Sequence, residues 1–199
     1  MMVDGTVTRT ATLKTGGNTM SLPQPKAPAA TLADWETWEG RWELINGVAY
    51  DMTPAPSPDH QAVSSNLHGA IWTLLEEARR RHGDGCRVFA APLDVFLPSG
   101  VVQPDLLVVC DPARITQRGI EGAPDLVVEI LSPSTAGKDL TRKRWAYEAA
   151  GVPEYLIVDP DGRVGLLLRL HEGRYEEAAR VEWGTVVALL GGRLPVTLG

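Results

Sequence analysis

The chain has 199 residues, of which 44% are hydrophobic and 22% charged, and its net charge is −6. This length and composition predict a globular protein with one sizeable core, and no apolar run approaches the roughly 20 residues of a membrane-spanning helix. The acidic balance argues against a broad nucleic-acid-binding surface, which needs a surplus of Lys and Arg, but it leaves room for a local basic cleft.

Residues 1–30 are predicted to be a flexible tail, because Thr, Gly, Asn and Pro dominate them without hydrophobic periodicity. Residues 31–199 are then expected to be a single domain, and Met20 is an alternative start of translation. No secretory signal is recognisable, so we expect a cytoplasmic protein. Cys86 and Cys110 form neither a CxxC pair nor a Cys/His cluster, so we expect no zinc site and no disulfide framework.

The first predicted elements are a short helix and a hairpin. Thr31 is a good N-cap for a helix that ends near Gly40. Asn46-Gly47, between two β-prone runs within residues 42–52, is a strong hairpin signal. Glu43 on its first strand has two open interpretations, either part of a site or a solvated acid at a strand edge.

The longest predicted helix runs from His60 to about Arg81, where apolar residues recur at 3.6-residue spacing. Three arginines, a histidine and Gly83 end it, and we attribute these basic residues to the helix dipole and to solubility. His60, at the helix start, either faces a cleft or is exposed, and exposure is the preferred interpretation.

Short strands are predicted at residues 86–90, 93–97 and 101–110. Pro104 within the last of these marks a strand edge or a bulge. Such places often redirect a side chain into a site, here that of Asp105, although a turn residue is the simpler interpretation.

Glu129 interrupts the apolar run Leu126–Leu131, which is bounded by Pro124 and Pro133 and predicts a buried strand. A carboxylate there is costly unless it is paired or holds a metal. The following helix, residues 138–150, places Asp139, Lys143 and Tyr147 on one face at four-residue spacing. A strand at 154–159 and further antiparallel strands are expected to complete the sheet.

These residues predict a site for Mg²⁺, with Mn²⁺ as an alternative, because such ions prefer oxygen ligands. Asp105, Glu129 and the backbone carbonyl of Ile130 are the predicted ligands, and Glu43 is a further ligand or orients the others. Lys143 is predicted to stabilise developing charge, and Tyr147 to bind a phosphate oxygen or fix the lysine. The competing interpretation is that Lys143, among Lys138, Arg142 and Arg144, belongs to a solvated face.

Several separated motifs occur in a fixed order. They are Glu43–Gly47, Ser57–His60, Pro104–Leu106, Pro124–Thr135, then Asp139, Lys143 and Tyr147, and finally Gly151–Pro160. From Thr31 to the C-terminal strands this series resembles the Uma2 (DUF820) family of restriction-endonuclease-like proteins. The resemblance implies a PD-(D/E)xK nuclease fold of the α/β (α+β) class, a mixed β-sheet flanked by helices.

On that fold the resemblance makes Asp105 the first acid and Glu129 the second. The superfamily's lysine stands two residues after the second acid, where this chain has Leu131, so Lys143 on the following helix is its expected substitute. The resemblance also implies a homodimer that pairs two active sites.

The leading functional prediction is a Mg²⁺-dependent endonuclease that hydrolyses DNA phosphodiester bonds with a metal-activated water. The alternatives are a catalytically silent nucleic-acid-binding or structural module, and a phosphoryl hydrolase for a small substrate. The acidic charge weakens the DNA prediction. Basic residues near the proposed site partly restore it: Arg114, Arg118, Lys138, Arg142 and Arg144.

Overall fold

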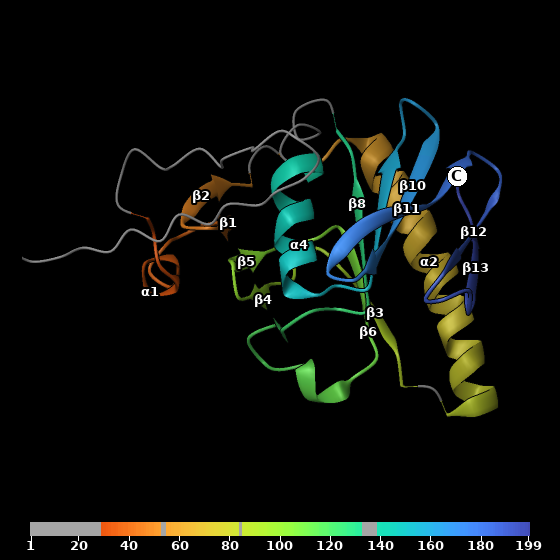
Figure 1. Cartoon of the computed structure of the whole chain (residues 1–199), viewed down its shortest axis with the longest axis horizontal. Coiled ribbons are helices and arrows are strands. Elements are labelled where there is room, and N and C mark those ends of the chain that lie inside the picture. The colour runs from red at the N-terminus through yellow and green to blue at the C-terminus, as the bar shows by residue number, and fades with distance from the viewer. Residues whose placement is uncertain (1–28, 53–54, 84, 133–138) are drawn as a thin grey trace, which may run out of the picture.

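The computed structural model describes residues 29–52, 55–83, 85–132 and 139–199, and Figure 1 shows their arrangement. The tail predicted for residues 1–30, including Met20, lies outside the described residues except for its last two. Lys138 also lies outside them. No helix in the described part of the chain is long and apolar enough to cross a membrane.

The helical elements are α1 (Leu32–Trp35), α2 (Pro58–His82), a 3₁₀ turn η1 (Pro112–Arg114), a π-helical turn η2 (Asp139–Lys143) and α4 (Arg144–Ala150). The first strands are β1 (Trp42–Ile45), β2 (Val48–Asp51), β3 (Arg87–Ala90), β4 (Val95–Leu97), β5 (Gly100–Val102), β6 (Leu106–Val109) and β7 (Ile120–Glu121). The later strands are β8 (Leu126–Ile130), β9 (Glu154–Asp159), β10 (Val164–His171), β11 (Arg174–Glu182), β12 (Val186–Leu189) and β13 (Leu194–Thr197).

The strands form two large sheets and one small one. A five-stranded sheet has the order β2-β1-β5-β4-β7, and a six-stranded sheet has the order β11-β10-β9-β8-β6-β3. Both are mixed, because β4 and β7 pair in parallel, as do β8 and β9, among otherwise antiparallel neighbours. The mixed α+β class is therefore confirmed, although two large mixed sheets replace the single one that was expected.

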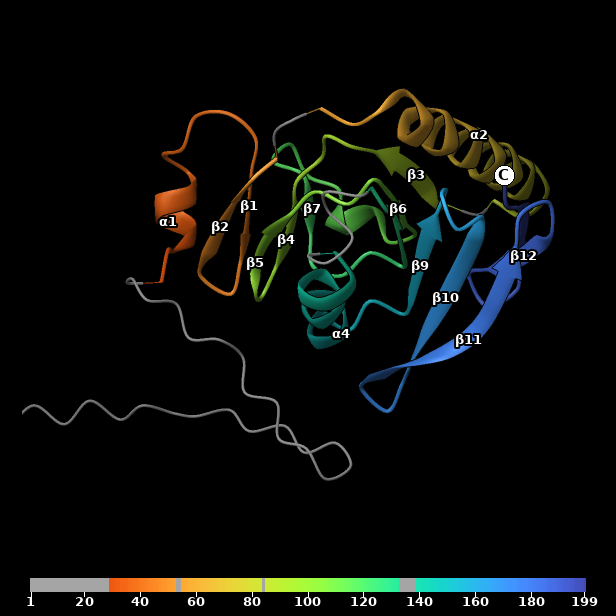
Figure 2. The same ribbon diagram turned by 90° about the horizontal axis from the view of Figure 1, so that it is seen from above.

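The six-stranded sheet lies between two apolar cores, with α2 on one face and α4 on the other (Figure 2). Successive strand residues point to opposite faces. Residues 106, 108, 126, 128, 130, 156 and 158 belong to the core that contains α2. Residues 107, 109, 127, 155 and 157 belong to the core that contains Tyr147 of α4. Glu129 has the parity of Val127, so its side chain lies on the α4 face.

Local signals explain the helix and hairpin boundaries. Asn46 and Gly47 both have positive φ, 51° and 76°, as a tight two-residue hairpin turn requires. The Ser57 side chain accepts from His60 N at the start of α2, and Gly83 ends it in the left-handed conformation. The Thr31 cap is present as well, but α1 is shorter than predicted and ends at Trp35.

The run 101–110 is two strands rather than one, because β5 belongs to the five-stranded sheet and β6 to the six-stranded sheet. Gln103, Pro104 and Asp105 form the crossing between them. Pro104 cannot donate a ladder hydrogen bond, which is consistent with a break in pairing at this point. The crossing brings residues of both sheets to one place, and the candidate site lies there.

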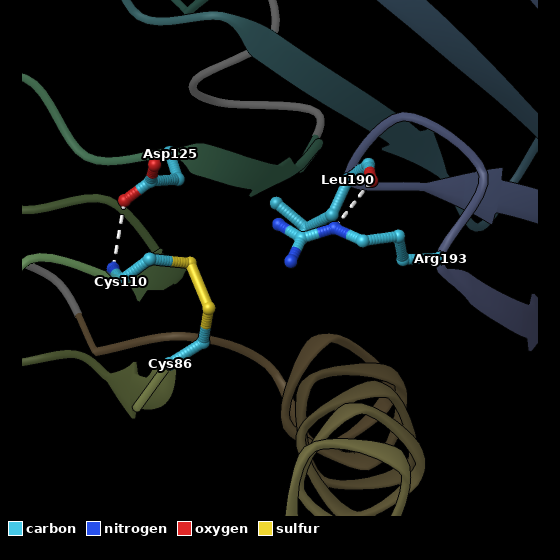
Figure 3. The surroundings of a disulfide bond; sticks show 5 residues. All are labelled: Cys86, Cys110, Asp125, Leu190 and Arg193. Atoms are coloured by element: carbon cyan, nitrogen blue, oxygen red, sulfur yellow. Dashed lines mark hydrogen bonds between the residues drawn. A yellow bond between two sulfur atoms is a disulfide. The ribbon is translucent and has the colours of Figure 1, made fainter. Parts of the chain in front are cut away.

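The cysteines are joined, contrary to the sequence expectation, by a disulfide between Cys86 and Cys110 (Figure 3). β3 and β6 are antiparallel, and Arg87 lies opposite Val109. The next pair outward is therefore Cys86 and Cys110, which are neighbours across the strands despite a sequence separation of 24. The backbone N–H of Cys110 also donates to Asp125 Oδ2 at 2.7 Å. Spacing in sequence was a poor guide to this proximity.

The C-terminal strands do not all extend one sheet, as was expected. β10 and β11 join the six-stranded sheet, whereas β12 and β13 pair only with each other. Buried Glu154 at the start of β9 holds this second hairpin. It accepts from Leu190 N at 2.7 Å and from Gly191 N and Arg169 Nε, each at 2.9 Å.

Candidate active site

The residues that the sequence singled out come from both large sheets and from the α4 region. Glu43 is on β1, Asp105 in the crossing between β5 and β6, Glu129 on β8, Lys143 at the end of η2 and Tyr147 on α4. Contacts between neighbouring members link them in two groups, which meet at Glu129 and Ile130.

Glu129 is 2% exposed and is contacted by two side chains from the helical segment above it. Lys143 Nζ lies 3.0 Å from its Oε1, and the hydroxyl of Tyr147 donates to the same oxygen at 2.6 Å. Lys143 and Tyr147 are four residues apart, and a helix brings such residues to one face. The helix preceding β9 therefore supplies the charge partner that a carboxylate on this buried strand requires.

Glu43 is also buried, at 4% exposure, so the interpretation as a solvated edge acid is wrong. Its Oε1 lies 2.9 Å from Lys143 Nζ and accepts from the backbone N–H of Gln103 at 2.8 Å. Lys143, itself 4% exposed, thus bridges two carboxylates from different sheets. The interpretation of Lys143 as part of a solvated face is wrong for the same reason.

Asp105 is held beside Glu129 by its Oδ2 atom. This atom accepts from the backbone N–H of Ile130 at 2.7 Å and lies 3.2 Å from His60 Nε2. Because a carboxylate oxygen only accepts, the facing nitrogen of His60 is the protonated one. Asp105 is therefore fixed by the residue that follows Glu129, and by the start of α2.

His60 is 8% exposed, so the preference for an exposed histidine was wrong. The burial of His60 is detectable from the spacing of apolar residues in the sequence. His60 precedes Val63 by three residues and Leu67 by seven, which places it on the buried face of α2. Its position on that face aims it at the crossing rather than at solvent.

Tyr147 is fully buried, and this burial raises the pKa of its hydroxyl well above the ordinary value of 10.0. The negative charges of Glu129 and Glu43 raise this pKa further. The hydroxyl therefore stays protonated and donates to Glu129. A role of Tyr147 in fixing Lys143 or in binding a phosphate oxygen stays a prediction.

Two further residues of the site were missed by the sequence reasoning. Gln103 lies in the crossing, is 8% exposed, and contacts Glu43 through its backbone. Arg41 precedes β1 and donates to Gln103 Oε1 through Nε and Nη2, at 3.2 and 3.0 Å. Arg41 has no special local pattern, and only the pairing of β1 with β5 brings it to Gln103.

Among the described residues no group of three or more His, Cys, Asp and Glu side chains is arranged to hold a metal ion. Mg²⁺ commonly takes only one or two carboxylates, with waters and substrate phosphates completing its shell. Asp105 and Glu129 supply hard oxygen donors of this kind. Both hydrogen bonds of the Asp105 side chain go to Oδ2, so within the described chain Oδ1 has no hydrogen-bonding partner. The donor set therefore fits a Mg²⁺ ion with two protein carboxylates.

A crystal structure of "a putative nuclease belonging to DUF820" from Anabaena variabilis ATCC 29413 has a similar fold. Its TM-score is 0.68 at 20% identity, over 84% of this chain and 94% of that chain. The cryoEM structure of a DrdV–DNA complex has a TM-score of 0.31 at 16% identity, over 62% of this chain and 12% of that chain. No curated protein matches this chain.

The first of these likenesses, at this level of identity, shows that the two chains share a fold, and it confirms the expected fold class. The family model Uma2, described as "Putative restriction endonuclease", matches residues 29–192, and that span includes every residue of the candidate site. The chain therefore belongs to the Uma2 family.

Proposed function

We propose that this protein is a Mg²⁺-dependent endonuclease that hydrolyses phosphodiester bonds of DNA. The observation that carries the proposal is the position of Lys143. Its ammonium nitrogen lies 3.0 Å from Glu129 Oε1, although the position two residues after Glu129 is occupied by Leu131. A buried lysine beside the second acid is the feature that the nuclease proposal requires and that the local sequence lacks.

The proposed roles follow from the contacts. Asp105, Glu129 and the backbone carbonyl of Ile130 would hold Mg²⁺, or Mn²⁺ in its place, with Glu43 as a further ligand or as a group that orients Lys143. When bound, the ion lowers the pKa of a water and neutralises charge on the scissile phosphate. Lys143 stabilises the charge that develops on that phosphate. Tyr147 and His60 position Glu129 and Asp105, and Tyr147 could also bind a phosphate oxygen.

A second candidate is a catalytically silent module on the same fold. The observation in its favour is that Lys143 already lies between two carboxylates, at 2.9 and 3.0 Å. A buried charge cluster that satisfies itself has a structural use without any metal. A hydrolase for a small phosphate substrate is the third candidate, and the net charge of −6 favours it over a DNA enzyme.

Titration calorimetry with Mg²⁺ and Mn²⁺ tests the metal site. The wild type is expected to bind one of these ions, and Glu129→Gln to lose at least about a hundredfold in affinity, because even partners of a ligand contribute ten- to a hundredfold. Glu121→Gln is the matched control, since Glu121 is an exposed strand glutamate and should behave as wild type. Absence of binding by the wild type would refute the nuclease proposal.

Plasmid cleavage then separates an enzyme from a silent module. Metal-dependent cleavage is expected for the wild type and not for Lys143→Met, which keeps the length of the side chain but removes its charge. Binding of metal without any cleavage would favour the silent module. Cleavage that survives Lys143→Met would overturn the role given to the lysine.

Two further features remain predictions and belong to the same proposal. A homodimer would pair two active sites and so cut both strands of a duplex, and sedimentation analysis tests it. A cytoplasmic location is the other. Disulfides are rare in the cytoplasm. Thiol titration of protein extracted under non-reducing conditions therefore tests the location and the Cys86–Cys110 bond in one measurement.

A further inference from the structure

Two arginines lie beside the Glu43–Lys143 pair and present their charge to solvent. Arg41 is exposed and directly precedes β1, where its carbonyl accepts from Met52 N at 3.0 Å and so continues the hairpin ladder. Because strand side chains alternate, Arg41 shares a face with Glu43. Gln103 contacts both residues, Glu43 through its backbone N–H and Arg41 through its side-chain oxygen.

The guanidinium of Arg41 is held in one orientation by this amide. The Gln103 side-chain nitrogen donates to Asp94 Oδ1 at 2.8 Å, which leaves its oxygen facing Arg41. Asp94 thus contacts the neutral amide and forms no ion pair with the arginine. In the described part of the chain, Arg41 Nη1 makes no hydrogen bond, so this nitrogen of the guanidinium group is available to a ligand.

Arg142 lies beside the other member of the same pair, Lys143. It directly precedes Lys143, it is exposed, and its guanidinium carbon lies 5.2 Å above the centre of the Tyr50 ring while it also donates to the Tyr50 hydroxyl. Tyr50 is the cross-strand partner of Glu43. Arg41 and Arg142 therefore both adjoin the pair, Arg41 along β1 and Arg142 across the hairpin and next to Lys143.

Both guanidinium groups are held by neutral acceptors, and this distinguishes them from many other arginines of the protein. Within the described residues neither forms a salt bridge. Six other arginines pair with an acid: Arg79 with Glu76, Arg81 with Glu77, Arg114 with Asp111, Arg118 with Glu36, Arg169 with Glu154, and Arg180 with Glu177. Two oriented, uncompensated positive charges next to the candidate site of an acidic protein are suited to an anionic ligand.

We propose that Arg41 and Arg142 bind the phosphates on either side of the scissile phosphodiester. The substrate is then a nucleic-acid strand, which carries such flanking phosphates, and not a small phosphodiester, which lacks them. This inference rests on the proposed function, since it places the scissile phosphate at the site of Asp105, Glu129 and Lys143. It also separates Arg41 and Arg142 from Arg114 and Arg118, whose charges are already paired.

The test is the salt dependence of DNA binding, measured by fluorescence anisotropy of a labelled duplex in the presence of Ca²⁺ with the full chain. Each phosphate contact contributes about 0.9 to the slope of log affinity against log salt concentration. Arg41→Gln and Arg142→Gln should each lower this slope by about one, and the double variant by about two. The loss should be similar for duplexes of different sequence, because phosphates carry no sequence information.

Two control variants test whether a lower slope reports the loss of a phosphate contact. Arg80→Gln removes the same charge from an exposed position in the last turn of α2, at the opposite end of that helix from His60, and should leave the slope unchanged. Arg41→Lys keeps the charge while losing the two-nitrogen contact to Gln103, so it should retain most of the slope. A slope that falls as far in Arg41→Lys as in Arg41→Gln would indicate a structural effect and overturn the inference.

The outcomes distinguish this inference from the function on which it rests. If the wild type cuts DNA and the Arg41→Gln and Arg142→Gln slopes equal that of Arg80→Gln, the flanking-phosphate role is wrong and the nuclease proposal stands. If the wild type hydrolyses only a small diester such as bis(p-nitrophenyl) phosphate and does not bind DNA, both the role and the DNA substrate are wrong. Slopes that are lower in Arg41→Gln and Arg142→Gln, but not in Arg80→Gln, support the inference.

Discussion

Glu129 and Glu154 are buried glutamates on neighbouring parallel strands, yet their partners differ in kind. Glu154 accepts from the backbone N–H groups of Leu190 and Gly191 and from Arg169, using both of its oxygens. Glu129 is contacted by side chains, the ammonium of Lys143 and the hydroxyl of Tyr147, which reach it from one helical segment. Backbone donors fix a carboxylate within the fold, whereas an ammonium ion can be replaced or displaced by another cation.

A buried carboxylate in an apolar strand is therefore not by itself a sign of function. Glu154 is 4% exposed and Glu129 2%, so burial does not separate them. The two glutamates differ instead in the kind of group that donates to them. The contacts of Glu154 and the disulfide stabilise the scaffold, and those of Glu129, Glu43 and Asp105 form the candidate site. Variants of the first group should change stability and leave metal affinity unchanged, whereas variants of the second group should lower metal affinity.

The largest effect on stability is expected from removal of the disulfide. The double variant Cys86→Ser/Cys110→Ser releases a loop with a sequence separation of 24 and should lower the free energy of unfolding by about 3 kcal/mol. Urea denaturation of the variant and the oxidised wild type measures this difference. Calorimetry should find the same Mg²⁺ affinity in both, and a large loss of affinity would place the disulfide in the site group.

Glu154→Gln is expected to have the next largest effect, because the amide keeps the shape of the side chain but loses its charge and one acceptor. The free energy of unfolding should fall by about 2 kcal/mol, the order of one hydrogen bond to a charged group. Urea denaturation checks this value, and Glu129→Gln provides the matched variant on the adjacent strand. Equal Mg²⁺ affinity in Glu154→Gln and wild type is required, since a reduced affinity would erase the distinction between the two glutamates.

Much of this architecture is readable from the sequence because the signals are local. Asn46-Gly47 specifies its turn, Ser57 and Gly83 bound α2, and four-residue spacing puts Lys143 and Tyr147 on one helix face. The strand of Glu129 follows from a bounded apolar run. Its position on the α4 face follows from period-two alternation once the facing core is known.

The features that were missed depend on pairing between distant segments. The Cys86–Cys110 bond requires the β3–β6 register, and the contact of Arg41 with Gln103 requires β1 to pair with β5. The break at Pro104 was detected, but a proline does not reveal that the next strand belongs to another sheet. His60 is an exception, because its helical phase with Val63 and Leu67 indicated burial and was overlooked.

A smaller effect is expected from His60→Ala, which removes one of the two donors on Asp105 Oδ2 and leaves Ile130 N in place. Metal affinity should fall about tenfold, the lower end of the range for groups that orient a ligand. His60→Gln should restore part of it, since its amide nitrogen can donate in place of Nε2. His68→Ala on the same helix is the control, and an equal loss there would show an effect of α2 as a whole.

The smallest expected effect is the contribution of Tyr147 and Tyr175 to the pH dependence of stability. It is absent at neutral pH and appears only in basic solution. Burial is the main cause that raises the pKa of both hydroxyls, and nearby carboxylates, Glu129 for Tyr147 and Glu148 for Tyr175, raise it further. The unfolded chain ionises near the ordinary value of 10.0, so it loses protons in base before the folded protein does. Stability from these two groups is therefore complete below that pH and is lost as pH rises above it. Urea denaturation across this range should show a shallower loss for Tyr147→Phe than for wild type, whereas parallel curves would mean that Tyr147 is not buried as described.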